Sequence, residues 1–201
     1  TVRKGTSAET AAAMEQASVD VLPTRTVYEL RSAEVCVTLT FLTPALPGDL
    51  DLLSRPLTYV TWDVRSADAK LHGVSIYFDA SSEICVNSPE ERVEWAREDS
   101  PPLAVLRVGS KDQPVLAKKG DDLRIDWGHL HAATPLETSL RRSITSGPAA
   151  REGFVAGRAL PGPVDYPQIP ELAQRGLLRV ARFLDVLAER LAEREHLATD
   201  R

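Results

Sequence analysis

The stretch 34–42, EVCVTLTFL, alternates between apolar and more polar residues along its whole length. Val35, Val37, Leu39 and Phe41 occupy one set of positions, and Cys36, Thr38 and Thr40 occupy the positions between them. Successive side chains of a β-strand point to opposite faces of a sheet. The stretch therefore predicts a strand of an antiparallel sheet that has one face toward a core and one more polar face.

Similar period-two runs recur along most of the chain, separated by turns that contain proline or glycine. The runs that predict further strands are 18–22, 25–31, 57–65, 73–78, 83–86, 92–96, 103–108 and 122–132. We expect 73–78 and 83–86 to form a hairpin or a meander, and 92–96 to pair with 103–108. Short strands at this spacing favour a mainly β fold, an antiparallel two-sheet β-sandwich of the supersandwich kind.

The pattern changes after Pro135. The stretch 146–156, SGPAAREGFVA, predicts a short helix, because Gly147-Pro148 suits a helix start and Gly157 suits a helix end. The stretch 159–170 contains four prolines and is typical of a linker.

From 171 to about 197 the chain predicts an amphipathic helix. The apolar residues at helical spacing, which share one face, are Leu177, Val180, Leu184, Leu187 and Leu191. Such a helix either docks on its own domain or serves self-association or partner binding. The predicted organisation is a flexible or loop-like segment (1–16), a β-sandwich domain (17–145), a short helix with a proline-rich linker (146–170) and a C-terminal helix (171–201).

Composition excludes several classes of partner. The 24 Lys and Arg residues against 29 Asp and Glu residues give a formal net charge of −5, and the sequence pI is about 5.4. Nucleic acid is not an expected partner, because phosphate binding requires a basic surface. No apolar run approaches the roughly 20 residues that span a bilayer, so no membrane partner is expected. The opening residues, TVRKGTSAET, lack the apolar stretch of a signal peptide.

The two cysteines, Cys36 and Cys85, are too few for a disulfide framework. Each lies in a strand-like run, so they are either ordinary half-buried thiols or one bridge between neighbouring strands. The histidines and cysteines have no CxxC or HExxH spacing, and we expect neither a structural zinc site nor a cofactor.

An acidic cluster in 118–127, KKGDDLRIDW, is the first candidate for chemistry. Asp121, Asp122 and Asp126, with Trp127 beside them, could bind a hard cation or act as an acid/base pair. On a strand, Asp122 and Asp126 would lie about 13 Å apart at a rise of roughly 3.3 Å per residue, too far for one metal ion unless the segment bends. The alternative is that Gly120 and Asp121 form a turn and that Asp122 and Arg124 lie on the solvated face of the strand. Lys118 and Lys119 are expected to lie in that solvated turn.

Three other groups are weaker candidates. The segment 78–83, FDASSE, has a polar tip that is typical of a turn. His129 and His131 are two residues apart on a predicted strand and could face one ligand, or could be an ordinary surface pair. Trp62, Trp95 and Trp127 could line a sugar-binding platform, or could anchor the core.

Longer stretches resemble one known family. The segments that carry the likeness are MEQASVDVLPTRTVYEL (14–30), LTFLTPALPGDLDLLSRPLTYVTWDVRS (39–66), VSIYFDASSEICVN (74–87) and VLRVGSKDQPVLAKKGDDLRIDWGHLHAA (105–133). They are similar to the region that precedes a six-hairpin α/α-toroid domain in glutaminase A-like proteins. That resemblance implies a secreted family, an extracellular or periplasmic location, and hydrolysis of the side-chain amide of glutamine to glutamate and ammonia. Beyond about residue 166 the resemblance ends, and no catalytic residue transfers to a position of this chain.

Three functions follow from these observations. The first is a non-catalytic β-sandwich module that packs against a catalytic toroid in full-length relatives. The second is a small amidohydrolase centred on Asp121, Asp122 and Asp126. The third is a carbohydrate-binding module, because β-sandwiches also precede α/α toroids in glycoside hydrolases.

Overall fold

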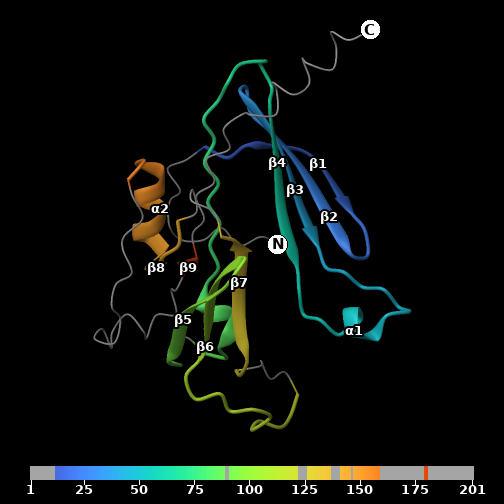
Figure 1. Ribbon diagram of the computed structural model, residues 1–201, viewed down its shortest axis with the longest axis vertical. Helices are drawn as coiled ribbons and strands as arrows, with labels where there is room; N and C mark the ends of the chain where they lie inside the picture. The colour runs from blue at the N-terminus through green and yellow to red at the C-terminus, as the bar shows by residue number, and fades with distance from the viewer. Residues whose placement is uncertain are drawn as a thin grey trace. The chain divides into compact units, whose positions relative to one another are not determined.

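The structure is a computed structural model that describes residues 12–88, 91–121, 126–136, 141–145, 147–158 and 179–180 (Figure 1). These residues form two compact units. Unit 1 contains the described residues up to Gly73, and unit 2 contains those from Val74 onward. Both units are built on antiparallel sheets, so the prediction of a mainly β fold with two antiparallel sheets is confirmed.

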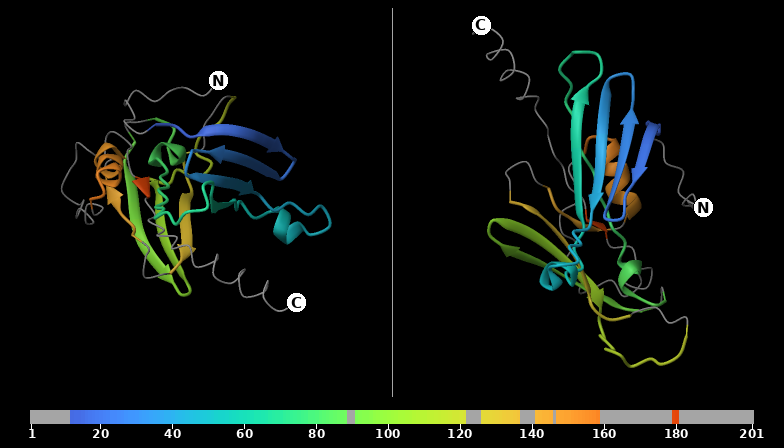
Figure 2. Two further views of the ribbon diagram at one scale, coloured as in Figure 1. Left: turned by 90° about the horizontal axis from the view of Figure 1, so that it is seen from above. Right: turned by 90° about the vertical axis from the view of Figure 1, so that its right-hand side faces the viewer.

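Unit 1 is a four-stranded meander. Its strands are β1 (Glu15–Val21), β2 (Arg25–Arg31), β3 (Val35–Leu42) and β4 (Tyr59–Ser66), which pair in the order of the sequence. Figure 2 shows the four strands side by side. All four were predicted within a few residues of their bounds, although β1 begins inside the segment that was expected to be a loop.

The register of unit 1 places its apolar side chains on one face. Tyr28, Leu39 and Trp62 lie opposite one another on β2, β3 and β4. Two residues further along these strands, Leu30, Val37 and Val64 form a second row on the same face. Thr38 lies on the other face, where its hydroxyl donates to Glu29 Oε1 at 2.8 Å. The apolar and polar positions predicted from the sequence therefore lie on the two opposite faces of the sheet. Within 12–73, however, every described residue is half-buried or exposed.

The connection from β3 to β4 contains one short helix, α1 (Leu50–Leu53). Asp49 caps it, because its carboxylate accepts from the Leu52 amide at 2.9 Å. Both Leu50 and Leu53 are exposed. The helix therefore breaks a long loop without adding to a core.

Unit 2 contains a three-stranded sheet with β6 (Leu103–Ser110) in the centre, between β5 (Val93–Ser100) and β7 (His129–Pro135). Alternate residues of β6 are buried: Ala104, Leu106, Val108 and Ser110. The other buried side chains described in this unit are Ile76, Ser82, Cys85, Val86, Asp126, Ser143, Ile144, Thr145 and Ala150. The predicted pairing of 92–96 with 103–108 is confirmed.

Two predicted strands of unit 2 are wrong. The run 73–78 belongs to neither sheet, and the run 83–86 is replaced by a short 3-10 helix, η1 (Ser82–Cys85). Ile76 and Val86 are nevertheless buried, whereas Ile84 is 72% exposed, so strand alternation does not account for the burial within 83–86. Cys85 is also buried, with its sulfur 3.6 Å from the Val108 carbonyl. These runs cover the buried face of the β5–β7 sheet rather than extending it at an edge.

The run 122–132 forms a strand only in its last part. β7 begins at His129, Gly128 before it has a left-handed φ of +90°, and residues 122–125 lie outside the described residues. Because a residue with positive φ does not fit a strand, Gly128 separates Asp126 and Trp127 from β7.

The predicted short helix is confirmed as α2 (Gly147–Val155). Two residues within the stretch predicted to be helical, Arg179–Val180, instead form the short strand β9, which pairs with β8 (Ile144–Thr145). This part of the helix prediction is wrong, because the backbone of 179–180 bonds to a neighbouring strand. The remainder of 171–201 and the linker 159–170 lie outside the described residues.

Two further findings concern the cysteines and the helices. Cys36 is a half-buried free thiol and Cys85 a buried one, and burial raises the pKa of the Cys85 thiol. None of the helices in the described ranges is long and apolar enough to cross a membrane.

Candidate functional site

The connection between β6 and β7, residues 111–128, carries the acidic cluster found in the sequence. Gln113 holds the two ends of this connection together. Its amide nitrogen donates to the carbonyls of Ser110 at 2.7 Å and Gly128 at 3.1 Å, and its amide oxygen accepts from the Gly128 amide at 2.7 Å. One side chain therefore satisfies backbone groups at the end of β6 and at the start of β7.

Asp126 and Lys118 form an ion pair across the loop. The Lys118 ammonium contacts Asp126 Oδ2, and the Ser110 hydroxyl donates to the Asp126 carbonyl. The Asp126 side chain is only 6% exposed, whereas that of Lys118 is 40% exposed. A buried carboxylate requires a partner, and here the partner comes from eight positions earlier in the chain. Lys118 is exposed, as expected for a turn before Gly120, but its ammonium also reaches Asp126, which the sequence did not indicate.

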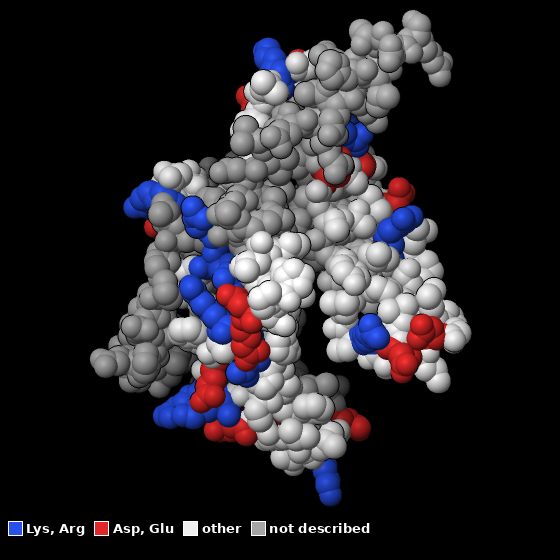
Figure 3. All heavy atoms as spheres, in the orientation of Figure 1, with Lys and Arg blue, Asp and Glu red and all other residues white. Residues whose placement is uncertain are grey.

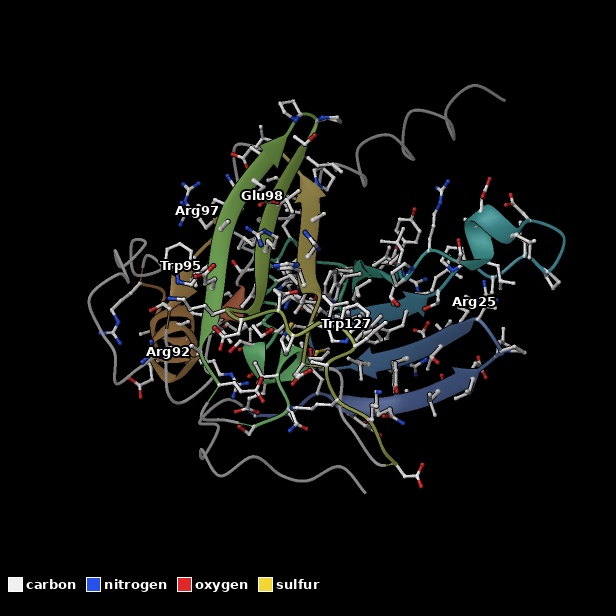
Figure 4. All side chains as sticks on the ribbon, turned by 90° about the horizontal axis from the view of Figure 1, so that it is seen from below. Arg25, Arg92, Trp95, Arg97, Glu98 and Trp127 are labelled. Atoms are coloured by element: carbon white, nitrogen blue, oxygen red, sulfur yellow. The ribbon has the colours of Figure 1, made fainter. Side chains whose placement is uncertain are left out.

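The other predicted site residues lie apart from this pair or outside the description. Asp121 is exposed, next to Gly120, whose φ is +127°. Asp122 lies outside the described residues. Trp127 is half-buried on the segment before β7, as Figure 4 shows. The structure thus brings Asp126 together with Lys118, Ser110 and Gln113. The sequence did not indicate Ser110 or Gln113, because their partners are backbone groups of a distant segment.

The arrangement limits what Asp126 can do. Its carboxylate is neutralised by an ammonium at contact distance, so it is not an uncommitted metal ligand or general base. Across the part of the chain that is described, no three His, Cys, Asp or Glu side chains are grouped so as to hold a metal ion. The geometry supports a fixed loop rather than a reaction centre.

A second cluster joins the segment before η1 to α2. Arg151 Nε donates to Asp79 Oδ2 at 3.1 Å, and the Tyr77 hydroxyl donates to the same oxygen at 3.0 Å. The rings of Tyr77 and Phe154 lie 5.1 Å apart. Asp79, read from the sequence as part of a turn, therefore anchors helix α2 to its unit.

The outer face of the unit 2 sheet is polar. Arg107 Nε on β6 donates to Glu98 Oε1 on β5 at 2.7 Å, and Lys111 Nζ lies 4.0 Å from Glu94 Oε1. Figure 3 shows acidic and basic side chains mixed over this unit, and Figure 4 shows Trp95 and Arg97 on the opposite side of β5 from Glu98. Trp95 thus shares its face with the buried row of β6, which fits a core anchor better than a sugar platform.

Two carboxylates have lowered pKa values. Asp68, in the turn after β4, accepts from His72 Nε2 at 2.6 Å, from the Lys70 amide at 3.1 Å and from the Ser66 hydroxyl at 3.1 Å. These bonds, that to His72 first, lower its pKa from 3.8 to about 2. The Arg142 guanidinium lowers the pKa of Asp99 through paired hydrogen bonds. Both groups stabilise local structure in the ionised form.

The family model described as "Domain of unknown function (DUF5127)" matches residues 24–171. Glutaminase A of Aspergillus oryzae is 27% identical over 139 residues, which are 67% of this chain and 19% of that protein. The chain therefore spans about a fifth of the length of this relative. No solved structure matches.

We predict that Lys118→Met destabilises unit 2 by about 1–3 kcal/mol, because it leaves a buried carboxylate without its partner. Asp126→Asn should cost less, since a neutral amide is cheaper to bury than a carboxylate. Urea denaturation followed by fluorescence measures both. Lys119→Met, at the adjacent exposed lysine, is the matched control and should change stability by no more than about 0.5 kcal/mol. Equal effects at the two lysines would contradict the role of the ion pair.

We also predict a pH dependence from Asp68. Its folded pKa is below its ordinary value, so its stabilising contribution is present above about pH 4 and is lost as the pH falls toward about 2. Asp68→Asn should therefore reduce the loss of unit 1 stability between about pH 5 and about pH 2.5, as measured by denaturant titration at each pH. Asp63→Asn, at a carboxylate that is 68% exposed in the same unit, is the control. The role of Asp68 would be contradicted if both variants lose as much unfolding free energy on acidification as the parent chain.

Proposed function

This chain belongs to the DUF5127 family, and we propose that it is a non-catalytic accessory module of a glutaminase A-like protein. In this proposal, unit 1 uses the apolar face of its sheet to pack against the remainder of a longer polypeptide. That remainder is the α/α-toroid domain that the family resemblance implies, and it carries out the hydrolysis of glutamine.

The apolar face of unit 1 is the observation that carries the proposal. We define this face as the apolar side chains on one side of β1–β4: Val19, Val21, Tyr28, Leu30, Val37, Leu39, Phe41, Val60, Trp62 and Val64. A sheet with one apolar face normally buries it against a second layer. Here every described residue of 12–73 is half-buried or exposed, whereas unit 2 contains a buried core. An extended apolar surface of this kind is typical of an interaction site.

The edges of the same sheet favour a face-on partner. β1 is exposed along its whole length, and its polar residues Glu15, Gln16, Ser18 and Asp20 alternate with the apolar ones. Charged side chains on an edge strand disfavour the addition of another strand. A partner that covers the apolar face, such as a layer of helices, fits the side chains better than one that extends the sheet.

Two observations support a non-catalytic role. The carboxylate of Asp126, the best-placed candidate base of the sequence, is held by Lys118. In addition, the chain covers only 19% of the glutaminase A that it resembles, so most of such a protein would lie beyond the matched region. Glutamine hydrolysis is therefore proposed for the assembled protein and not for this module.

A glutaminase assay tests the absence of catalysis in the purified chain. We expect no ammonia release from L-glutamine above a protein-free blank, because the carboxylate of Asp126 is paired with Lys118 and the proposed catalytic domain lies outside this chain. Ammonia release by the parent chain that is lost in Asp122→Asn, with the fold unchanged by circular dichroism, would instead establish an amidohydrolase centred on that cluster.

A matched pair of substitutions on β3 tests the apolar face. Leu39→Arg puts a charge at the centre of this face, and Thr40→Arg puts the same charge on the opposite face one residue later. The parent chain should bind the dye 8-anilinonaphthalene-1-sulfonate, which reports exposed apolar surface. Leu39→Arg should strongly reduce dye fluorescence, and Thr40→Arg should leave it near the parent value.

Two results would contradict this role of the face. One is a parent chain that binds no dye, which would mean that the face is already covered. The other is an equal reduction in both variants, which would place the dye elsewhere. Sedimentation velocity on the same samples separates exposure in a monomer from burial in a dimer, because a dimer formed through the face should dissociate in Leu39→Arg alone.

A further inference from the structure

His129 and His131 share the outer face of the unit 2 sheet. They are alternate residues of β7, both are exposed, and their ring centres lie 6.1 Å apart with the planes at 56°. Alternate strand residues point to the same side, so the two imidazoles are held next to each other by the backbone of one strand. Among the three histidines that the structure describes, His72 is paired with Asp68, whereas His129 and His131 are exposed and have no ion pair with another described residue.

Gly109 leaves room for the imidazole ring of His129. It lies directly opposite His129 on β6, and a Cβ added to it would fall 2.5 Å from His129 Cδ2 and 2.6 Å from the Gly128 carbonyl oxygen. The imidazole therefore occupies the space that a side chain on β6 would need. A ring packed on the backbone in this way loses fewer conformations when it binds a ligand than a freely rotating one.

The charges that face the two rings cancel. Arg107 lies directly opposite His131, but its guanidinium is bonded to Glu98. Lys111, at the end of β6, is close to Glu94. Each of these two positive groups on the outer face is therefore matched by a negative one, which reduces the repulsion that a cation approaching the imidazoles would meet.

We propose that His129 and His131 form a two-imidazole binding site for one divalent transition-metal ion, of the class of nickel, copper or zinc. Imidazole nitrogen is a preferred ligand of these ions. A metal ion about 2.1 Å from one nitrogen of each ring would hold the ring centres about 5.3 Å apart in a tetrahedral site. The ring centres lie 6.1 Å apart, so the exposed side chains would have to move less than about 1 Å closer to share one ion. Water completes the coordination, which makes this an open site on the surface, unlike a closed four-ligand structural zinc site.

Titration calorimetry with Ni²⁺ tests the proposal, because thiols compete less for Ni²⁺ than for zinc or copper(I). The parent chain should bind one Ni²⁺ ion in this mode. His129→Gln and His131→Gln should each weaken binding by about tenfold or more, because each removes one of two ligands. The double variant should lose the binding event. His72→Gln is the matched control, because His72 is committed to Asp68 and lies outside the pair.

Several outcomes would overturn the site. Binding by the double variant with the parent affinity would place the ion elsewhere, and full binding by either single variant would mean that the rings do not act together. Absence of any Ni²⁺ binding by the parent chain would also reject it. A thermal melt with and without Ni²⁺ is the second readout: the parent chain should melt higher with the ion and the double variant should not. The equal melting of all variants without the ion checks that each is folded.

Discussion

The buried side of β6 holds unit 2 together. Ala104, Leu106 and Val108 on the central strand are buried, and the Cys85 sulfur of η1 lies 3.6 Å from the Val108 carbonyl. Because β6 has a hydrogen-bonded neighbour on each side, its backbone is satisfied within the sheet and its alternate side chains are free to pack. The same strand ends at Ser110, where the loop to β7 begins. The placement of the loop therefore depends on the packing of this strand.

The β6–β7 loop illustrates how a conspicuous acidic motif can serve structure. Gln113 joins its two ends, and Lys118 reaches back to the one carboxylate of the cluster that is known to be buried, that of Asp126. Two of the charged residues of KKGDDLRIDW, Lys118 and Asp126, thus form an ion pair within the loop. The proposed metal-binding residues of this sheet, His129 and His131, lie on β7, after the loop.

Unit 1 differs from unit 2 in having no buried residue among those described. Its meander has complete ladders between neighbouring strands and a continuous apolar face, yet the second layer that would bury this face is not supplied by residues 12–73. The region that matches glutaminase A of Aspergillus oryzae is 19% of the length of that protein, which agrees with the proposed accessory role. A module of a larger protein would leave for its neighbour the surface that an independent domain must bury itself.

The sequence by itself determined the strands of unit 1, the β5–β6 hairpin and helix α2, because period-two alternation, proline-containing turns and a Gly-Pro helix start are local signals. The local pattern did not predict the conformation of 73–78 and 83–86. Ile76 and Val86 are buried and Ile84 is exposed, and neither run is a strand, because a run becomes a strand only when a neighbour offers hydrogen bonds. For the same reason the ion pair of the exposed Lys118 was not predicted. Its pairing with Asp126 depends on a loop that returns to β6, and that return is fixed by Gln113 and by the packing beneath it, which no local pattern contains.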